Sequence, residues 1–155
     1  MRPANVIFAT QLLILYLAAG CVHTTAPSAG KLIPEGFARY TKARQIKAVS
    51  PEGVIYRVRS EDNKPFAELP FWKEALKKRM QDAGYIFLRE APIQADAQEG
   101  YLLELTAPYG QQDYTYLMAV FVLKKKIKIV EAAGEVSDLA AHRAAILEAI
   151  QSLKF

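Results

Sequence analysis

The chain has 155 residues, of which 52% are hydrophobic and 23% are charged. This length fits one domain, and this balance is that of a globular protein and excludes a disordered chain. The net charge of +4 is too small to indicate a nucleic-acid-binding protein, and the single cysteine excludes an intramolecular disulfide.

The first twenty residues have the layout of a secretory signal peptide. Arg2 and the chain's amino group precede an apolar run at residues 6–19, which only Thr10 and Gln11 interrupt. The run has 14 residues, whereas a helix that spans a bilayer needs about 20. Small residues close it. We therefore expect residues 1–20 to be removed on export.

The segment Leu17-Ala18-Ala19-Gly20-Cys21 resembles the lipobox of bacterial lipoprotein precursors. In that family the cysteine thiol receives diacylglycerol, a peptidase cuts before the cysteine, and the new amino group is usually acylated. The resemblance implies lipidation at Cys21 and a membrane held through that lipid. The family usually has leucine where this chain has Ala18. An ordinary signal peptide, or a short membrane anchor with an incidental Cys21, is the alternative.

Residues 21–31 predict a flexible tether between the lipid and the folded body, because they are small, polar and without periodicity. Ten such residues reach about 18 Å as a random coil. Val22 stands where enteric lipoproteins of the inner membrane carry aspartate. By that analogy we expect a periplasm-facing address at the outer membrane, if the source is Gram-negative.

The folded body is expected at residues 32–155, and it opens with a β-hairpin. Residues 45–49 and 54–59 flank a segment in which Pro51 and Gly53 suit a type I turn. In the second arm, valine and tyrosine alternate with arginine, as a strand with one buried face requires.

A helix is predicted at residues 69–83. Pro70 fits its first turn, an apolar stripe with Trp72 and Leu76 follows the helical period, and Gly84 suits a left-handed cap.

After this helix the pattern returns to strands. Residues 85–89 predict a strand, 91–99 a polar loop, and 100–107, 114–123 and 127–133 three further strands.

The last element is a helix that begins at the N-cap Ser137 and ends near Lys154. These elements predict an α+β fold: a mainly antiparallel sheet of about five to six strands, with two helices packed on one face.

The body lacks the residue sets that catalysis or metal binding needs. His142, its only histidine, lies off the apolar stripe of the last helix, and no spaced donor set accompanies it. Glu104 and Glu131 could form a carboxylate pair, but carboxylates on strands more often face water. We therefore expect no catalytic residue, no cofactor and no metal.

Tyrosine and glutamine side chains gather around Gly110, between two predicted strands. Because tyrosine buries area while it keeps a polar tip, this segment is the best candidate for a partner contact. The alternative is a hairpin loop whose tyrosines pack on the sheet. The candidate residues are Tyr109, Gln111, Gln112, Tyr114 and Tyr116.

Two basic clusters could meet anionic lipid or cell-wall polymer. A solvated surface is the simpler interpretation of both. The clusters are Lys73, Lys77, Lys78 and Arg79 on the first helix, and Lys124, Lys125, Lys126 and Lys128 at a hairpin tip.

The body is similar in its order of elements to small α+β domains of envelope-assembly lipoproteins, such as penicillin-binding-protein activators. The shared pattern is a helix that ends at Gly84, then strands, then a hairpin that closes on a C-terminal helix. The resemblance implies a non-enzymatic scaffold that binds an envelope protein and no nucleic acid. The alternatives are a small-ligand or lipid-binding module, and an enzyme that uses His142 or Glu104.

Overall fold

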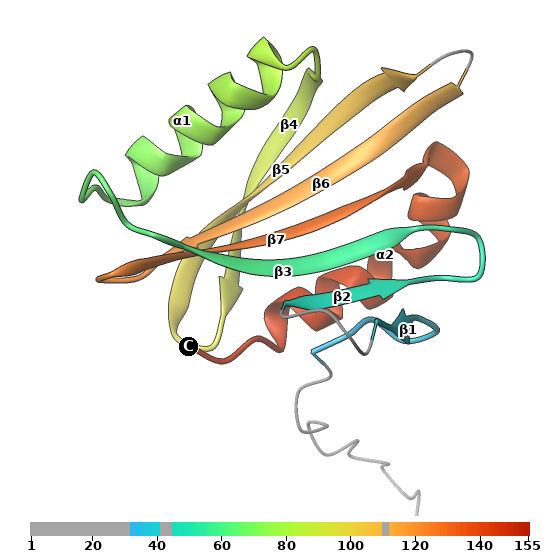
Figure 1. Ribbon diagram of the computed structural model, residues 1–155, viewed down its shortest axis with the longest axis horizontal. Helices are drawn as coiled ribbons and strands as arrows, with labels where there is room; N and C mark the ends of the chain where they lie inside the picture. Colours follow the sequence, from blue (N-terminus) through green and yellow to red (C-terminus); the bar gives the residue numbers. More distant parts are fainter. Residues whose placement is uncertain (1–31, 41–44, 110–111) are drawn as a thin grey trace, which may run out of the picture.

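The computed structural model describes residues 32–40, 45–109 and 112–155, which form one antiparallel sheet with two helices (Figure 1). The strands are β1 Ala38–Arg39, β2 Ile46–Val49, β3 Ile55–Asp62, β4 Ile86–Ala95, β5 Gln98–Tyr109, β6 Gln112–Val122 and β7 Lys126–Glu135, and the helices are α1 Leu69–Asp82 and α2 Val136–Gln151. The α+β class and the antiparallel sheet are thus confirmed. The sheet has seven strands instead of the expected five to six, because the short strand β1 pairs with β2.

The order of strands across the sheet is β1-β2-β3-β7-β6-β5-β4. The predicted hairpin is confirmed as β2 and β3. Its turn is closed by the Gly53 amide, which donates to the Ser50 carbonyl at 3.1 Å, and Gly53 has a φ of +91°. β3 then pairs with β7, with Tyr56 opposite Ala132, so the first hairpin extends the sheet that the last four strands build.

The sheet is buried on both faces, and each helix covers a different one. On β6, Leu117, Ala119 and Phe121 belong to the core that includes α2, whereas Met118 and Val120 belong to the core that includes α1. The expectation that both helices pack on one face is therefore wrong. The physical reason is the apolar run from Leu117 to Phe121 in β6, which needs cover on both faces of the strand.

The segment predicted as a polar loop at residues 91–99 is instead the end of β4 and the start of β5. Ile93 and Ala95 are buried, while Gln94 between them is exposed. This alternation is that of a strand with one buried face. Asp96 makes the tight turn possible, since its φ of 55° lies in the left-handed region that aspartate tolerates.

The predicted first helix is confirmed, but two of its lysines do not face solvent. Lys73 Nζ lies 2.6 Å from Glu90 Oε1, and Lys77 Nζ lies 3.8 Å from the centroid of the Phe87 ring. Both aliphatic stems thus pack toward β4, as long cationic side chains often do. The basic face expected on this helix is therefore reduced to Lys78 and Arg79, which are exposed.

The last helix begins at Val136, with Glu135 at the N-cap position instead of Ser137, and it ends at Gln151. Leu139, Ile146 and Ile150 form its buried face, as the apolar spacing indicates. Within the described ranges, neither helix is long and apolar enough to cross a membrane.

Candidate functional site

The sheet face that α1 covers is only partly covered. α1 packs on β4, β5 and β6, while the same face of β2, β3 and the adjoining end of β7 lies beyond it (Figure 1). Ile55 is 42% exposed there, although its neighbours in the chain, Val54 and Tyr56, belong to the core on the other face and are fully buried. We call this surface the open face; its residues are Lys47, Ile55, Arg57, Tyr85, Ala107, Tyr114, Tyr116, Glu131 and Ala133.

A buried carboxylate lies at the centre of the open face. Glu131 on β7 is 6% exposed, and three side chains donate hydrogen bonds to it. Arg57 Nε lies 2.6 Å from Oε2, Arg59 Nη2 lies 3.2 Å from Oε1, and the Tyr116 hydroxyl lies 2.7 Å from Oε1. The sheet register creates this cluster because it places Arg57 directly opposite Glu131.

These contacts fix the charge states of the cluster. Burial raises the pKa of Glu131, but the hydrogen bonds from Arg59 and Tyr116 outweigh it, so that the pKa lies below the ordinary value of 4.5. Burial, together with the neighbouring Glu131 charge, raises the pKa of Tyr116. At neutral pH the carboxylate is therefore ionised and the phenol is protonated, which suits recognition better than proton transfer.

Two adjoining hollows lie on the open face. One, of about 390 Å³, is lined by Tyr85, Tyr114 and Tyr116; the other, of about 230 Å³, is lined by Lys47, Arg57 and Glu131. Tyr116 and Ala133 line both. The Tyr85 and Tyr116 rings meet edge to face at 5.3 Å between centroids. The open face thus has an aromatic half and a charged half.

The structure places the predicted contact residues at different depths. Tyr114 and Tyr116 line the open face, and Gln112 is exposed, with its Oε1 3.4 Å from the Tyr114 hydroxyl. Gln111 and the side chain of Tyr109 lie outside the described residues, as do Cys21, the expected signal peptide and the expected tether.

Glu104 and Glu131, which the sequence allows as a carboxylate pair, lie on opposite faces of the sheet. Glu104 sits opposite Leu117 on the α2 side, where Arg89 Nε lies at 2.8 Å and Arg143 Nη2 at 3.0 Å from its Oε2. Each carboxylate therefore has its own arginines, and the two cannot share a proton or a substrate.

The position of His142 off the apolar stripe predicts a solvated residue of the last helix rather than a ligand, and the structure shows a partly exposed side chain with two contacts. Its side chain is 21% exposed, and its Nε2 lies 2.7 Å from Glu52 Oε2, in the β2–β3 turn. Its ring contacts Phe37 at 5.2 Å between centroids. In the described part of the chain, no group of three His, Cys, Asp or Glu residues could hold a metal ion.

Sequence reasoning does not identify Arg57, Arg59 and Tyr85 as site residues. The signal that could find the arginines is the isolated Glu131 inside an apolar strand, since a carboxylate there needs a cationic partner. Arg57 and Arg59 lie on one face of β3, and Tyr56 and Val58 lie on the other. The sequence alone does not show that β3 pairs with β7, and this pairing is what brings the arginines to Glu131.

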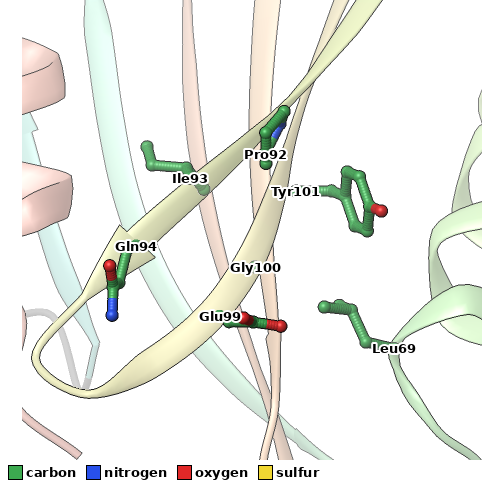
Figure 2. Close-up of a pocket in the computed structure, with 7 residues that line it drawn as sticks. All are labelled: Leu69, Pro92, Ile93, Gln94, Glu99, Gly100 and Tyr101. Atoms are coloured by element: carbon green, nitrogen blue, oxygen red, sulfur yellow. The ribbon is translucent and has the colours of Figure 1, made fainter.

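A further hollow, of about 270 Å³, lies between the β4–β5 hairpin and the start of α1 (Figure 2). Leu69 and Tyr101 face each other across it, and Gln94 and Glu99 lie near the turn. A Cβ at Gly100 would lie 2.5 Å from the Val120 carbonyl oxygen, so the backbones approach closely here. Its polar residues Gln94 and Glu99 are exposed, which makes it a weaker candidate than the open face.

Fold and site together define an α+β domain with a helix on each face of an antiparallel sheet, and a polar cluster on the part that the first helix leaves free. No protein-family model matches this sequence, and no curated protein matches it. The structure is similar to a Pseudomonas aeruginosa protein of unknown function, PA94, with a TM-score of 0.56 and 11% identity over 77% of this chain and 97% of that one. It is also similar to cyanobacterial PsbP (CyanoP) from Synechocystis, with a TM-score of 0.53 and 12% identity over 77% of this chain and 81% of that one. At such identities the likeness shows the fold alone.

Proposed function

We propose that this chain is a lipid-anchored protein of the cell envelope whose domain binds a partner protein at the open face, and that it is not an enzyme. The observation that carries the binding role is the composition of the open face. Exposed Ile55, half-exposed Arg57 and tyrosines lie together on a rigid sheet. Tyrosine and arginine are the residues that most often dominate binding energy at protein interfaces.

The charge states support recognition rather than catalysis. Glu131 is ionised and holds three donors, so it has little capacity left to accept a proton from a substrate. Its role is to orient Arg57, whose side chain remains 44% exposed and can still donate to a partner's carbonyl or carboxylate groups.

Site-specific photo-crosslinking in cells tests the binding role. We expect a photoreactive amino acid at Ile55 to trap a defined partner, and Lys47→Glu on the same surface to weaken that band. The control places the same amino acid at Ala144, an exposed residue on α2, which covers the opposite face of the sheet. Equal bands from both positions, or none from Ile55, would contradict the proposal.

The anchor rests on the Leu17–Cys21 segment, and it is tested separately. We expect a fatty-acid probe to label the protein in the membrane fraction, and Cys21→Ala to abolish the label. Labelling that persists in Cys21→Ala would contradict the proposed anchor at Cys21, and it would have no bearing on binding at the open face.

The aromatic half of the open face favours a second candidate, a small-ligand module. Its hollow of about 390 Å³ lies in the size range of small-molecule sites, which begins at about 300 Å³. Native mass spectrometry of the purified protein would then show a bound compound, and Ala107→Trp, which fills the hollow, would remove it. A protein that never carries a compound contradicts this candidate.

A further inference from the structure

One end of the molecule combines exposed lysines with exposed phenylalanines. The loop from β3 to α1 and the turn from β6 to β7 meet at this end (Figure 1). We call it the basic tip, and define it by Lys64, Phe66, Phe71, Lys124 and Lys125, all of which are exposed.

Asn63 joins the two parts of the basic tip into one surface. This residue is 5% exposed, and its backbone amide donates to the Lys125 carbonyl at 3.0 Å. Its side-chain amide donates to the Leu123 carbonyl at 3.3 Å, and its Oδ1 accepts from Trp72 Nε1 at 2.7 Å. The loop, the turn and the start of α1 are therefore held in fixed relative positions.

The basic tip has an excess of positive charge. Residues 59–68 and 122–128 contain six basic and three acidic side chains. Two of the acids already have cationic partners, because Asp62 pairs with Lys126 at 2.7 Å and Glu61 pairs with Arg59. The third acid is Glu68 at the N-cap position of α1, and its side chain makes no capping hydrogen bond.

The aromatic side chains of the basic tip are unusual for a surface that faces only water. Phe66 is 74% exposed and Phe71 is 51% exposed. Phe66 and Lys124 line the same hollow of about 200 Å³, so apolar and cationic groups are neighbours here. Exposed apolar side chains that are grouped, rather than scattered singly, mark an interaction site.

We propose that the basic tip binds an anionic phospholipid surface, with the lysines at the headgroup phosphates and the phenylalanine rings in the interface. Clustered cations attract an anionic bilayer, and apolar side chains add the burial that holds a domain there. The inference goes beyond the proposed function and does not need the anchor. If the anchor is present, it keeps the domain within reach of the bilayer, since ten extended residues span roughly 33 Å.

Vesicle co-sedimentation tests the proposal on residues 21–155 with Cys21→Ser, a chain that contains every described residue and carries no lipid. At physiological salt we expect binding to vesicles of phosphatidylcholine with 30% phosphatidylglycerol, and little binding to phosphatidylcholine alone. Lys124→Glu with Lys125→Glu should lower the partition coefficient about thirtyfold. Phe66→Ala with Phe71→Ala should lower it about tenfold.

The matched control is Lys78→Glu with Arg79→Glu, which makes the same change in net charge on the exposed side of α1. At this salt, charges more than about 8 Å from the lipid are largely screened, so the control should retain binding within about threefold. Circular dichroism confirms that each variant is folded. Equal losses in both charge variants, equal binding to both kinds of vesicle, or no binding to either would overturn the proposal.

Discussion

The two faces of the sheet are built from the same strands and differ in what covers them. On the α2 face, Val54, Tyr56 and Phe121 are fully buried beneath the last helix. On the other face α1 covers one half, and the uncovered half carries Ile55 at 42% exposure beside the Glu131 cluster. Both faces also carry an ion cluster, but Glu104 on the α2 side takes one of its arginines, Arg143, from the covering helix, whereas Glu131 takes its arginines from a neighbouring strand where the cover of α1 ends.

Under the proposed function, this difference separates the face that stabilises the domain from the face that binds a partner. The α2 face contributes most of its area to the buried core. The open face loses some burial, and its exposed side chains are held by a buried ion cluster. Matched substitutions on the two faces therefore test the assignment directly, and their expected effects on stability decrease from the isoleucines to the carboxylates and then to the tyrosines.

The largest contrast is between two isoleucines. Ile150→Ala should lower the free energy of unfolding by about 3 kcal/mol, because Ile150 is 1% exposed in the α2 core. Ile55→Ala should lower it by less than about 1 kcal/mol, since Ile55 is 42% exposed. Urea denaturation measures both. Similar losses from the two variants would mean that the open face is covered in solution.

The next contrast is between the two carboxylates. Glu131→Gln should lower the free energy of unfolding by about 2 kcal/mol, because it leaves Arg57 without its counter-charge, and Arg59 with Glu61 alone, beside a side chain that is 6% exposed. Glu104→Gln should cost about half as much, since its partner Arg89 is 65% exposed. Urea denaturation measures both variants. A larger loss of unfolding free energy in Glu104→Gln than in Glu131→Gln would contradict the central role of Glu131.

The contribution of Glu131 also depends on pH. Its pKa lies below the ordinary value of 4.5, so ionised Glu131 stabilises the folded state fully above pH 4.5. That contribution is lost as the pH falls from 4.5 through the folded-state pKa. The difference in unfolding free energy between wild type and Glu131→Gln should therefore be constant from pH 5 to 7 and shrink in more acidic buffer. A difference that grows on acidification would show that the pKa is raised.

The smallest individual effects on stability are expected for two tyrosines, and their signs are opposite. Tyr116→Phe should lower the free energy of unfolding by about 1 kcal/mol, because it removes the 2.7 Å hydrogen bond to Glu131. Tyr56→Phe should raise it by up to about 1 kcal/mol, since the Tyr56 hydroxyl is buried on the α2 face and has no hydrogen-bond partner among the described residues. Thermal melts of the two variants against wild type should shift in opposite directions.

Local patterns in the sequence predict most of the elements and not their arrangement. The β2–β3 turn and Gly84 can be identified because each needs a specific residue at a specific backbone angle. The side of the sheet on which α1 packs is a long-range property. The run from Leu117 to Phe121 is the one local sign of a sheet buried on both faces. The strand at residues 91–95 escapes prediction because Pro92 and polar residues are typical both of loops and of the edge strand it forms.

For the candidate site, the sequence indicates two of the tyrosines and the Glu131 carboxylate, and it misses the arginines that pair with Glu131. Tyr114 and Tyr116 stand out by composition alone, and the structure places both on the open face. Arg57 and Glu131 are 74 residues apart in the chain. Only the register of β3 against β7 makes them neighbours, and no local pattern contains that register.

Strands β5 and β6 contribute side chains to both apolar cores, one on each face of the sheet. If either helix detached, water would reach apolar side chains on these two strands. Those side chains include Leu105 and Met118 beneath α1, and Leu102 and Leu117 beneath α2. We therefore expect the domain to melt as one unit, with a single calorimetric peak whose van't Hoff and calorimetric enthalpies agree.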